Sequence, residues 1–129
     1  MSASSRHEPI MGEGVVKPVG PYSQAIRWGG VVFCSGQLGL DPTSGKLVEG
    51  VEAQAERALD NMAAILAEAG MGFGDVVKAT VLLASMDDFA KVNAIYAKRF
   101  PEAPPARAAY AVAKLPLGGL VEIEAIAAE

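Results

Sequence analysis

An apolar stripe with helical spacing runs from Val51 to Ala69, and it constrains the fold more than any other feature of this sequence. Apolar side chains recur three or four residues apart along this stretch, which is the pattern of an α-helix with one buried face. The stripe consists of Val51, Ala55, Ala58, Leu59, Met62, Ile65, Leu66 and Ala69. Gly70 follows where a left-handed glycine commonly ends a helix. The sequence therefore predicts a helix over 51–69 that must pack against another element.

Short β-rich segments lie on both sides of this helix in the sequence. Residues 23–28 and 31–35 flank Gly29-Gly30, a dipeptide suited to the positive φ angles of a tight hairpin. The continuous apolar run 31–33 indicates a strand that is buried on both faces. Residues 76–84 are rich in Val, Leu and Thr, so they predict a further strand.

A second helix is predicted over 89–100. Asp87 or Asp88 can act as its N-cap by accepting hydrogen bonds from the first N–H groups, and Pro101 stops it. Its apolar residues lie at near-helical spacing: Phe89, Val92, Tyr96 and Phe100.

The last two predicted strands, 108–113 and 120–127, form a pair joined by a turn at 116–119. The order of elements is then β-β-α-β-α-β-β, which is a two-layer α+β subunit with two helices packed on one mixed sheet. We expect a single domain over 15–129, preceded by a flexible N-terminal extension over 1–14. The other face of the sheet is too apolar to lie in water, so we expect a symmetric oligomer to cover it.

The counts of charged residues, cysteine and histidine argue against several classes of function. The net charge is −4 and no basic run is present, which disfavours nucleic-acid binding. Cys34 is the single cysteine and His7 the single histidine, so a disulfide framework and a multi-thiolate zinc site are excluded, and a site with several histidine ligands is hard to build. No stretch approaches the ~18 apolar residues of a membrane span. Residues 1–9 lack the apolar core of a signal peptide, so a cytoplasmic protein is expected.

Arg107 and Glu122 are the leading candidates for a functional site. Arg107 follows Pro104-Pro105-Ala106, and an arginine held by rigid prolines can present its planar fork to a carboxylate. The alternative is an ordinary surface arginine at a loop end. Glu122 and Glu124 alternate with apolar residues on a predicted strand, where a carboxylate covered by a partner can act as a general acid or base with a raised pKa. The alternative is the polar outer face of a half-buried strand.

Weaker candidates lie elsewhere in the chain. Tyr22 and Ser35 can each donate a hydrogen bond to a small polar ligand, although each residue taken singly is more often structural. Asn93 interrupts the second helix and either bonds a ligand or faces solvent. Cys34 adjoins a buried strand and is assigned no catalytic role.

Several motifs follow one another from about Val15 to the end of the chain. They are Gly20-Pro21-Tyr22-Ser23-Gln24, Cys34-Ser35-Gly36-Gln37, Phe89-Ala90-Lys91-Val92-Asn93, Pro105-Ala106-Arg107 and Glu122-Ile123-Glu124-Ala125-Ile126-Ala127. This ordered set resembles the Rid (reactive intermediate deaminase) family, RidA/YjgF-like and also called the endoribonuclease L-PSP family. The resemblance implies a chorismate-mutase-like subunit and a homotrimer with ligand clefts between subunits. It also implies a 2-iminobutanoate/2-iminopropanoate deaminase, which hydrolyses imines or enamines such as 2-aminoacrylate to a 2-oxo acid and ammonia, with no metal or organic cofactor.

The resemblance also implies roles for individual residues. Arg107 matches the arginine that binds the substrate carboxylate, and Glu122 matches the glutamate that orients water, with Glu124 as its structural partner. At Ala109 many relatives carry cysteine, so a thiol role is absent here, although a backbone group at this position can still bond water or substrate. Four residues match positions that line the cleft: Tyr22, Ser35, Gly36 and Asn93.

Two other functions remain open alongside the deaminase. A trimer that binds small ligands or acts as a chaperone without turnover is compatible with Ala109. An endoribonuclease or translation inhibitor is suggested by older family names. The net charge of −4 and the absence of histidine after His7 argue against that last function.

Overall fold

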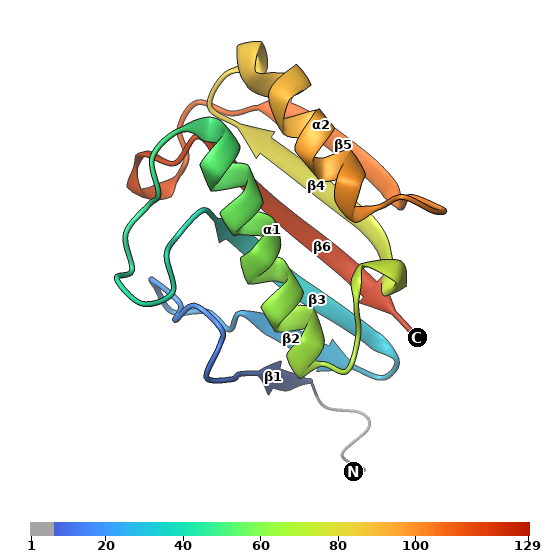
Figure 1. Ribbon diagram of the computed structural model, residues 1–129. Coiled ribbons are helices and arrows are strands. Elements are labelled where there is room, and N and C mark those ends of the chain that lie inside the picture. The colour runs from blue at the N-terminus through green and yellow to red at the C-terminus, as the bar shows by residue number, and fades with distance from the viewer. Residues whose placement is uncertain (1–6) are drawn as a thin grey trace.

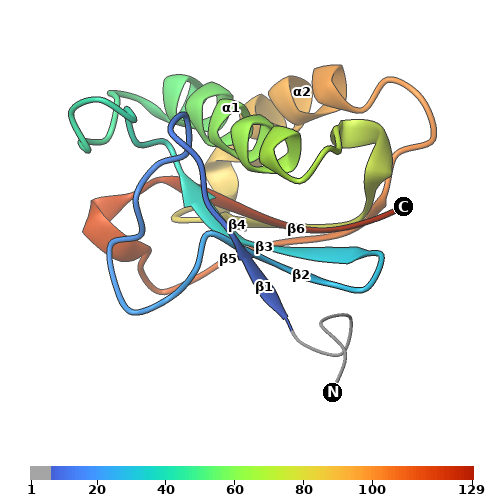
Figure 2. The ribbon, with the colours of Figure 1, turned by 90° about the horizontal axis from the view of Figure 1, so that it is seen from below.

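Two helices lie across one face of a six-stranded sheet in the computed structural model, which describes residues 7–129 (Figures 1 and 2). The helices are α1, Val51–Glu68, and α2, Phe89–Arg99. The strands are β1, Glu8–Ile10; β2, Ala25–Trp28; β3, Val31–Leu38; β4, Val76–Leu83; β5, Ala106–Ala111; and β6, Val121–Ala128. The predicted two-layer α+β architecture is confirmed. No helix within 7–129 is long and apolar enough to cross a membrane.

Helix α1 follows the predicted stripe closely. Six of its apolar side chains are no more than 1% exposed: Ala55, Ala58, Leu59, Met62, Ile65 and Leu66. Gly70 ends the helix region with a φ of +73°, as predicted. The β2–β3 hairpin is also confirmed, and Gly29 at its turn has a φ of +61°.

The strand order across the sheet is β1-β2-β3-β6-β4-β5. Strand β6 pairs antiparallel with both β3 and β4, whereas β5 pairs parallel with β4 at the sheet edge. The predicted pairing of the last two strands is therefore wrong, because β4 lies between them. Strand β6 has four alternating side chains that are at most 5% exposed, and a central position gives such a strand partners on both sides. Those residues are Val121, Ile123, Ala125 and Ala127.

Strand β1 lies in a segment for which no strand is predicted. Residues 8–10 fall in the segment predicted to be a flexible extension, yet they pair antiparallel with β2 in the register Glu8 to Arg27 and Ile10 to Ala25. Pro9 is tolerated there because an edge strand needs ladder bonds on one side only. Residues 1–6 of the predicted extension lie outside the described residues.

The start of α2 also differs from the prediction. The Oγ of Ser85 accepts a hydrogen bond from the Asp87 N–H at 3.1 Å and caps a 3₁₀ turn over Met86–Asp88 that leads directly into α2. Asp88 has helical backbone angles and forms no side-chain cap bond. The predicted aspartate cap is wrong because the helical path begins earlier than the apolar spacing indicates.

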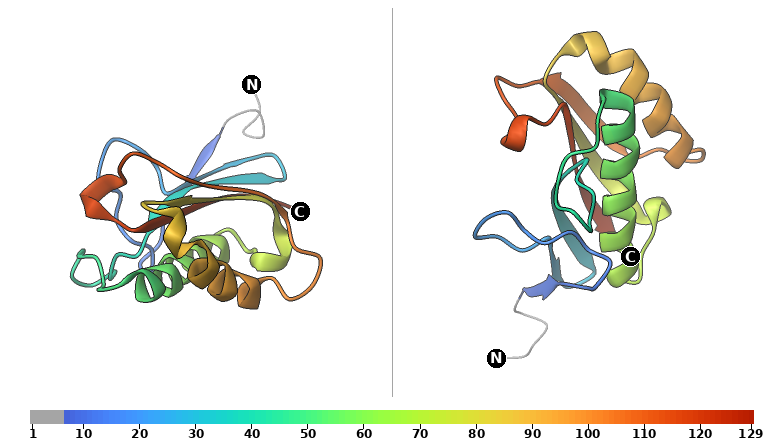
Figure 3. Two further views of the ribbon diagram at one scale, coloured as in Figure 1. Left: turned by 90° about the horizontal axis from the view of Figure 1, so that it is seen from above. Right: turned by 60° about the vertical axis from the view of Figure 1, so that its left-hand side comes forward.

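The two faces of the sheet differ in what covers them. The face toward α1 and α2 forms the main core, whereas no α-helix within residues 7–129 covers the outer face (Figure 3). Phe33 points to that outer face and is 43% exposed, so the expected burial of run 31–33 on both faces does not hold within one chain. Large side chains that share the outer face with Phe33 are Ile26, Trp28, Leu82, Tyr110 and Ile126.

Two buried polar residues of α1 fix the loops at one end of the sheet. Asn61 donates from Nδ2 to the carbonyl oxygens of Leu38 at 3.1 Å and Leu40 at 2.9 Å. Gln54 donates to the Val48 carbonyl and accepts from the Leu120 N–H. These bonds satisfy backbone groups that would otherwise be buried without partners. They also hold the loop ends beside the cavity described next.

Candidate functional site

Three residues of α2 hold the Arg107 guanidinium. Arg107 lies on β5 with its side chain on the helix face of the sheet, and its Nη1 donates to Asn93 Oδ1 at 2.7 Å. Its Cζ lies 4.9 Å from the ring centroid of Tyr96 and 5.6 Å from that of Phe89. Such cation–π contacts orient a guanidinium without neutralising its charge. Asn93 therefore contacts the arginine directly, which sequence reasoning left open.

Arg107 carries a positive charge without an internal counter-ion. Of the arginines within 7–129, Arg27, Arg57 and Arg99 each form an ion pair with a carboxylate. Arg107 has no carboxylate within 4.0 Å among the described residues. Its side chain is exposed and therefore accessible to a ligand. It opens onto a cavity of about 340 Å³ whose other lining residues are Asn93, Tyr96, Ala97, Phe100, Pro104 and Pro105. A planar fork at such a cavity fits a small carboxylate.

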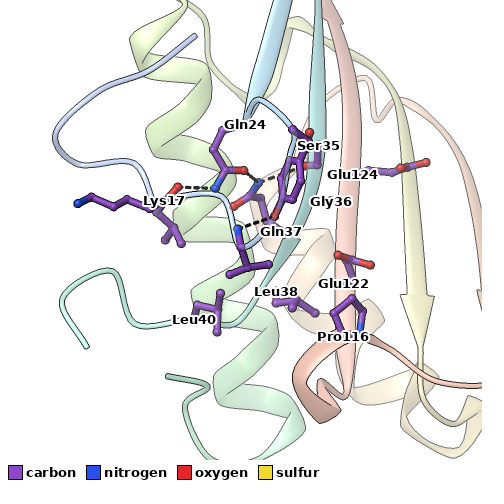
Figure 4. Close-up of a pocket in the computed structure, with 13 residues that line it drawn as sticks. Lys17, Gln24, Ser35, Gly36, Gln37, Leu38, Leu40, Pro116, Glu122 and Glu124 are labelled. Carbon is purple, nitrogen blue, oxygen red and sulfur yellow. Dashed lines mark hydrogen bonds between the residues drawn. The ribbon is translucent and has the colours of Figure 1, made fainter. Parts of the chain in front are cut away.

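Glu122 lies in a second cavity, of about 360 Å³, on the opposite face of the sheet (Figure 4). The cavity is lined by residues of the loop before β2, by β3, by Pro116 and by the two glutamates of β6. Burial raises the pKa of Glu122, and the nearby Glu124 carboxylate raises it further. A half-buried carboxylate with a raised pKa is suited to accept and return a proton.

The space for the Glu122 carboxylate exists because residue 36 is glycine. A Cβ on Gly36 would lie 2.8 Å from both Cδ and Oε2 of Glu122. Strand β3 is irregular between Cys34 and Gln37, where its register with β6 shifts. This bulge brings the backbone of Gly36 against the carboxylate. Gly36 thus belongs to the candidate site through its missing side chain.

Tyr22 and Ser35 line the same cavity but differ in the hydrogen bonds they offer. The Tyr22 hydroxyl accepts from the Val19 N–H at 3.3 Å, which leaves its own proton for a ligand. The Ser35 hydroxyl donates to the Ser23 carbonyl at 2.6 Å, so its proton is already used and only its lone pairs face a ligand. The proposed donor role therefore fits Tyr22 and not Ser35.

A buried glutamine pair supports this cavity and was missed by the sequence reasoning. Gln37 donates to Gln24 Oε1 at 2.9 Å, and Gln24 donates to the Val16 carbonyl (Figure 4). Both side chains are at most 3% exposed. They join the loop before β2 to the bulge of β3. The sequence did contain a clue to this pair, because Gln24 and Gln37 are the last residues of the two motifs that contain Tyr22 and Ser35.

The two cavities lie on opposite faces of the sheet. Arg107 pairs in register with Ala79 of β4, and Glu122 pairs with Leu82 of the same strand. Side chains alternate along a strand, so positions separated by three residues point to opposite faces. Within one chain the structure therefore groups Arg107 with Asn93, and Glu122 with Tyr22, Ser35 and Gly36. It does not bring the two groups together.

Ala109 and Cys34 offer no reactive group to either cavity. Ala109 packs against the main core on the helix face of β5, in register with Val81. Burial raises the pKa of the Cys34 thiol to about 11, which keeps it protonated. Within 7–129, no cluster of three or more His, Cys, Asp or Glu side chains is arranged to hold a metal ion.

Comparisons with known proteins give consistent matches over nearly the whole chain. The model of the family described as Endoribonuclease L-PSP matches residues 13–129. A 2-iminobutanoate/2-iminopropanoate deaminase from Bos taurus is 55% identical over 112 residues, which cover 86% of this chain and 82% of that protein. The crystal structure of RidA from an Antarctic Psychrobacter superposes with a TM-score of 0.92 at 45% identity, covering 95% of this chain and 99% of that one. Crystalline E. coli TdcF with bound serine has a TM-score of 0.89 at 35% identity, covering 95% and 98%.

Proposed function

Because the chain belongs to the endoribonuclease L-PSP family, whose relatives include the 2-iminobutanoate/2-iminopropanoate deaminases, we propose that it hydrolyses small 2-imino acids. The observation that carries this proposal is the Arg107 fork, oriented by α2 at an open cavity and lacking an internal carboxylate partner. A 2-imino acid supplies that carboxylate beside an electrophilic C=N carbon. Serine bound to TdcF, at 35% identity, is likewise a small molecule with a carboxylate.

The reaction consumes one water and needs no redox step. Water adds to the C=N carbon, and the imine nitrogen takes up a proton, which gives a carbinolamine. The C–N bond then breaks as the C=O bond forms, and the products are a 2-oxo acid and ammonia. Arg107 holds the carboxylate through two parallel N–H bonds, so the reacting carbon takes a fixed place.

Glu122 serves as the proton-transfer group. Its carboxylate accepts a proton from the attacking water and returns it to the departing nitrogen. The Tyr22 hydroxyl, whose proton is not used internally, donates to the substrate or to the water. Ala109 offers no thiol, so at this position only a backbone group bonds the water or the substrate.

A complete site on this proposal needs two copies of the chain. The carboxylate-binding group and the proton-transfer group lie on opposite faces of one sheet, so they meet when β5 and α2 of one copy approach the outer face of the next. The apolar outer face supplies the surface for this contact. We propose a closed ring of three copies, with one substrate cleft at each of its three boundaries.

The test is an assay of imine decay. Threonine dehydratase generates 2-iminobutanoate in solution, and ammonia release is followed with and without the protein. The wild type is expected to accelerate release, Arg107→Ala to lose the acceleration, and Arg107→Lys to lose about tenfold or more in kcat/KM because an ammonium cannot form two parallel bonds. Arg57→Lys, at an exposed pair with Asp60, is the matched control and should leave the rate unchanged.

Two results would replace the proposal with another function. A wild type that leaves imine decay at the buffer rate while binding 2-oxobutanoate would indicate a ligand-binding protein without turnover. RNA cleavage that persists in Arg107→Ala through repeated purification would indicate an endoribonuclease.

A further inference from the structure

The side chains that surround the Arg107 guanidinium come from successive turns of one helix face. Phe89, Asn93 and Tyr96 are separated by four and three residues, so α2 places them together. Asn93 accepts one N–H of the guanidinium, while the Cζ lies over the rings of Tyr96 and Phe89. The orientation of Arg107 is thus set by α2 more than by its own strand.

Tyr96 is the most firmly held of these three. It is 5% exposed, whereas Phe89 and Asn93 are only partly buried. Its ring lies 4.6 Å from that of Phe100, which in turn lies 5.1 Å from Phe73 in an edge-on arrangement. The Tyr96 ring is also nearer to the guanidinium than the Phe89 ring, 4.9 Å against 5.6 Å. It is therefore a fixed surface for Arg107.

The hydroxyl of Tyr96 has no role in this packing. Among the described residues it is the sole buried side-chain nitrogen or oxygen without a hydrogen-bond partner. Burial raises the pKa of Tyr96, although Arg107 opposes the shift, and a phenol in this position stays neutral. A buried donor without a partner destabilises the fold, so its removal should not harm stability.

We propose that Tyr96 is a positioning residue that acts through Arg107, and that its ring, not its hydroxyl, fixes the guanidinium in the plane that receives a carboxylate. An arginine that rotates freely loses side-chain entropy on binding, and a pre-oriented fork avoids that loss. The identity of the substrate rests on the proposed function. The binding of a carboxylate does not rest on the proposed function, because the charge and planar shape of the Arg107 guanidinium suit any small carboxylate.

The experiment compares Tyr96→Leu with Tyr96→Phe in the assembled protein. Binding of 2-oxobutanoate is measured by isothermal titration calorimetry, and KM and kcat are measured with 2-iminobutanoate. Tyr96→Leu is expected to raise both Kd and KM about two- to fivefold, the order of one cation–π contact to an exposed arginine, with kcat within about twofold. Tyr96→Phe should keep the wild-type values and melt no lower. Phe73→Leu removes a ring of the same cluster that does not contact Arg107, so it should leave Kd unchanged.

Specific results would overturn the inference. Wild-type Kd in folded Tyr96→Leu would show that the ring does not position Arg107. Equal impairment of Tyr96→Phe and Tyr96→Leu would assign the effect to the hydroxyl. Tyr96→Met, whose flexible side chain adapts to an irregular space without offering a ring, replaces Tyr96→Leu if that variant does not fold and carries the same expectation. A Tyr96-dependent Kd without imine hydrolysis by the wild type would reject the proposed function and keep the inference.

Discussion

Gly36 decides where the Glu122 carboxylate can lie. The side chain of Glu122 occupies the space that any Cβ at position 36 would need. A substitution at this glycine therefore changes the position of the carboxylate and the walls of its cavity, while the hydrogen-bonded core of the sheet remains intact.

We predict that Gly36→Ala lowers kcat for imine hydrolysis about tenfold or more, because the added methyl group forces the Glu122 carboxylate away from its place. The unfolding midpoint should change little, since Glu122 can rotate toward solvent. Gly74→Ala is the matched control, because a Cβ there meets no atom within 4 Å. Full activity in Gly36→Ala would mean that Glu122 does not act from the position seen in this structure.

Asn61 shows how one helix determines the shape of distant loops. Its two hydrogen bonds join α1 to the end of β3, beside the cavity that contains Glu122. Gly39 lies in the same region, where a Cβ would come within 2.5 Å of the Gln54 Cα. The loop after β3 therefore packs closely on α1, and Asn61 is itself only 3% exposed.

Asn61→Ala is expected to lower the free energy of unfolding by about 2–3 kcal/mol, because two buried carbonyl oxygens lose their donor. Urea unfolding at one fixed protein concentration measures this, since assembly adds to the apparent stability. Glu52→Ala, at an exposed site in the first turn of the same helix, should change stability by less than about 0.5 kcal/mol. Equal losses in the two variants would contradict the role of Asn61.

Local sequence patterns predict which segments form helices and strands, but not which strands pair with one another in the sheet. The α1 stripe and the Gly29 hairpin follow from spacing and turn chemistry within a few residues of each other. The position of β6 between β3 and β4 depends on which strands pair most favourably across the whole sheet. The turn at 116–119 carries no information about that choice. Strand β1 is three residues long and contains Pro9, so it carries no alternation to recognise. Ser85 was missed as a cap because an intervening 3₁₀ turn separates it from α2.

The site residues were identifiable because the ordered motifs resemble those of a known family, while their placement was not. Arg107 and Glu122 could be named from those motifs. That they point to opposite faces depends on the register of β5 and β6 against β4, which no motif encodes. The glutamine pair Gln24 and Gln37 depends on the bulge in β3 for the same reason.

At the scale of the whole molecule, the proposed function makes two cavities of one chain into two halves of binding sites. One is the Arg107 cavity at the β5 edge, and the other is the Glu122 cavity on the outer face. The exposed Phe33 and Tyr110 on that outer face are 43% and 50% accessible in a single copy. Contact between copies would cover these rings and complete both surfaces at once.

Mixing two inactive variants should restore activity. In a ring assembled from Arg107→Ala and Glu122→Gln chains, each mixed ring contains one boundary at which both groups are intact. An equal mixture is then expected to show about a quarter of the wild-type rate, because about three rings in four are mixed and each has one site in three. The two proteins are unfolded together, refolded and assayed for ammonia release.

A mixture of Arg107→Ala with Arg107→Lys provides the control, since no boundary in it regains a native arginine. If the first mixture were as inactive as its parents, both groups of a site would have to come from one chain. Light scattering of the same samples should give a mass near three times the 13.3 kDa of the chain.

On the proposed ring, the placement of the two cavities on opposite faces would also make the catalytic rate depend on concentration. A chain that separates from such a ring would keep its fold but retain only half of each site. Dilution below the dissociation constant of the ring would therefore lower the rate per chain without unfolding it, and concentration would restore it. Turnover per chain would then report the extent of assembly directly, and the abundance of the protein would set both the number of active sites and the fraction of chains that work.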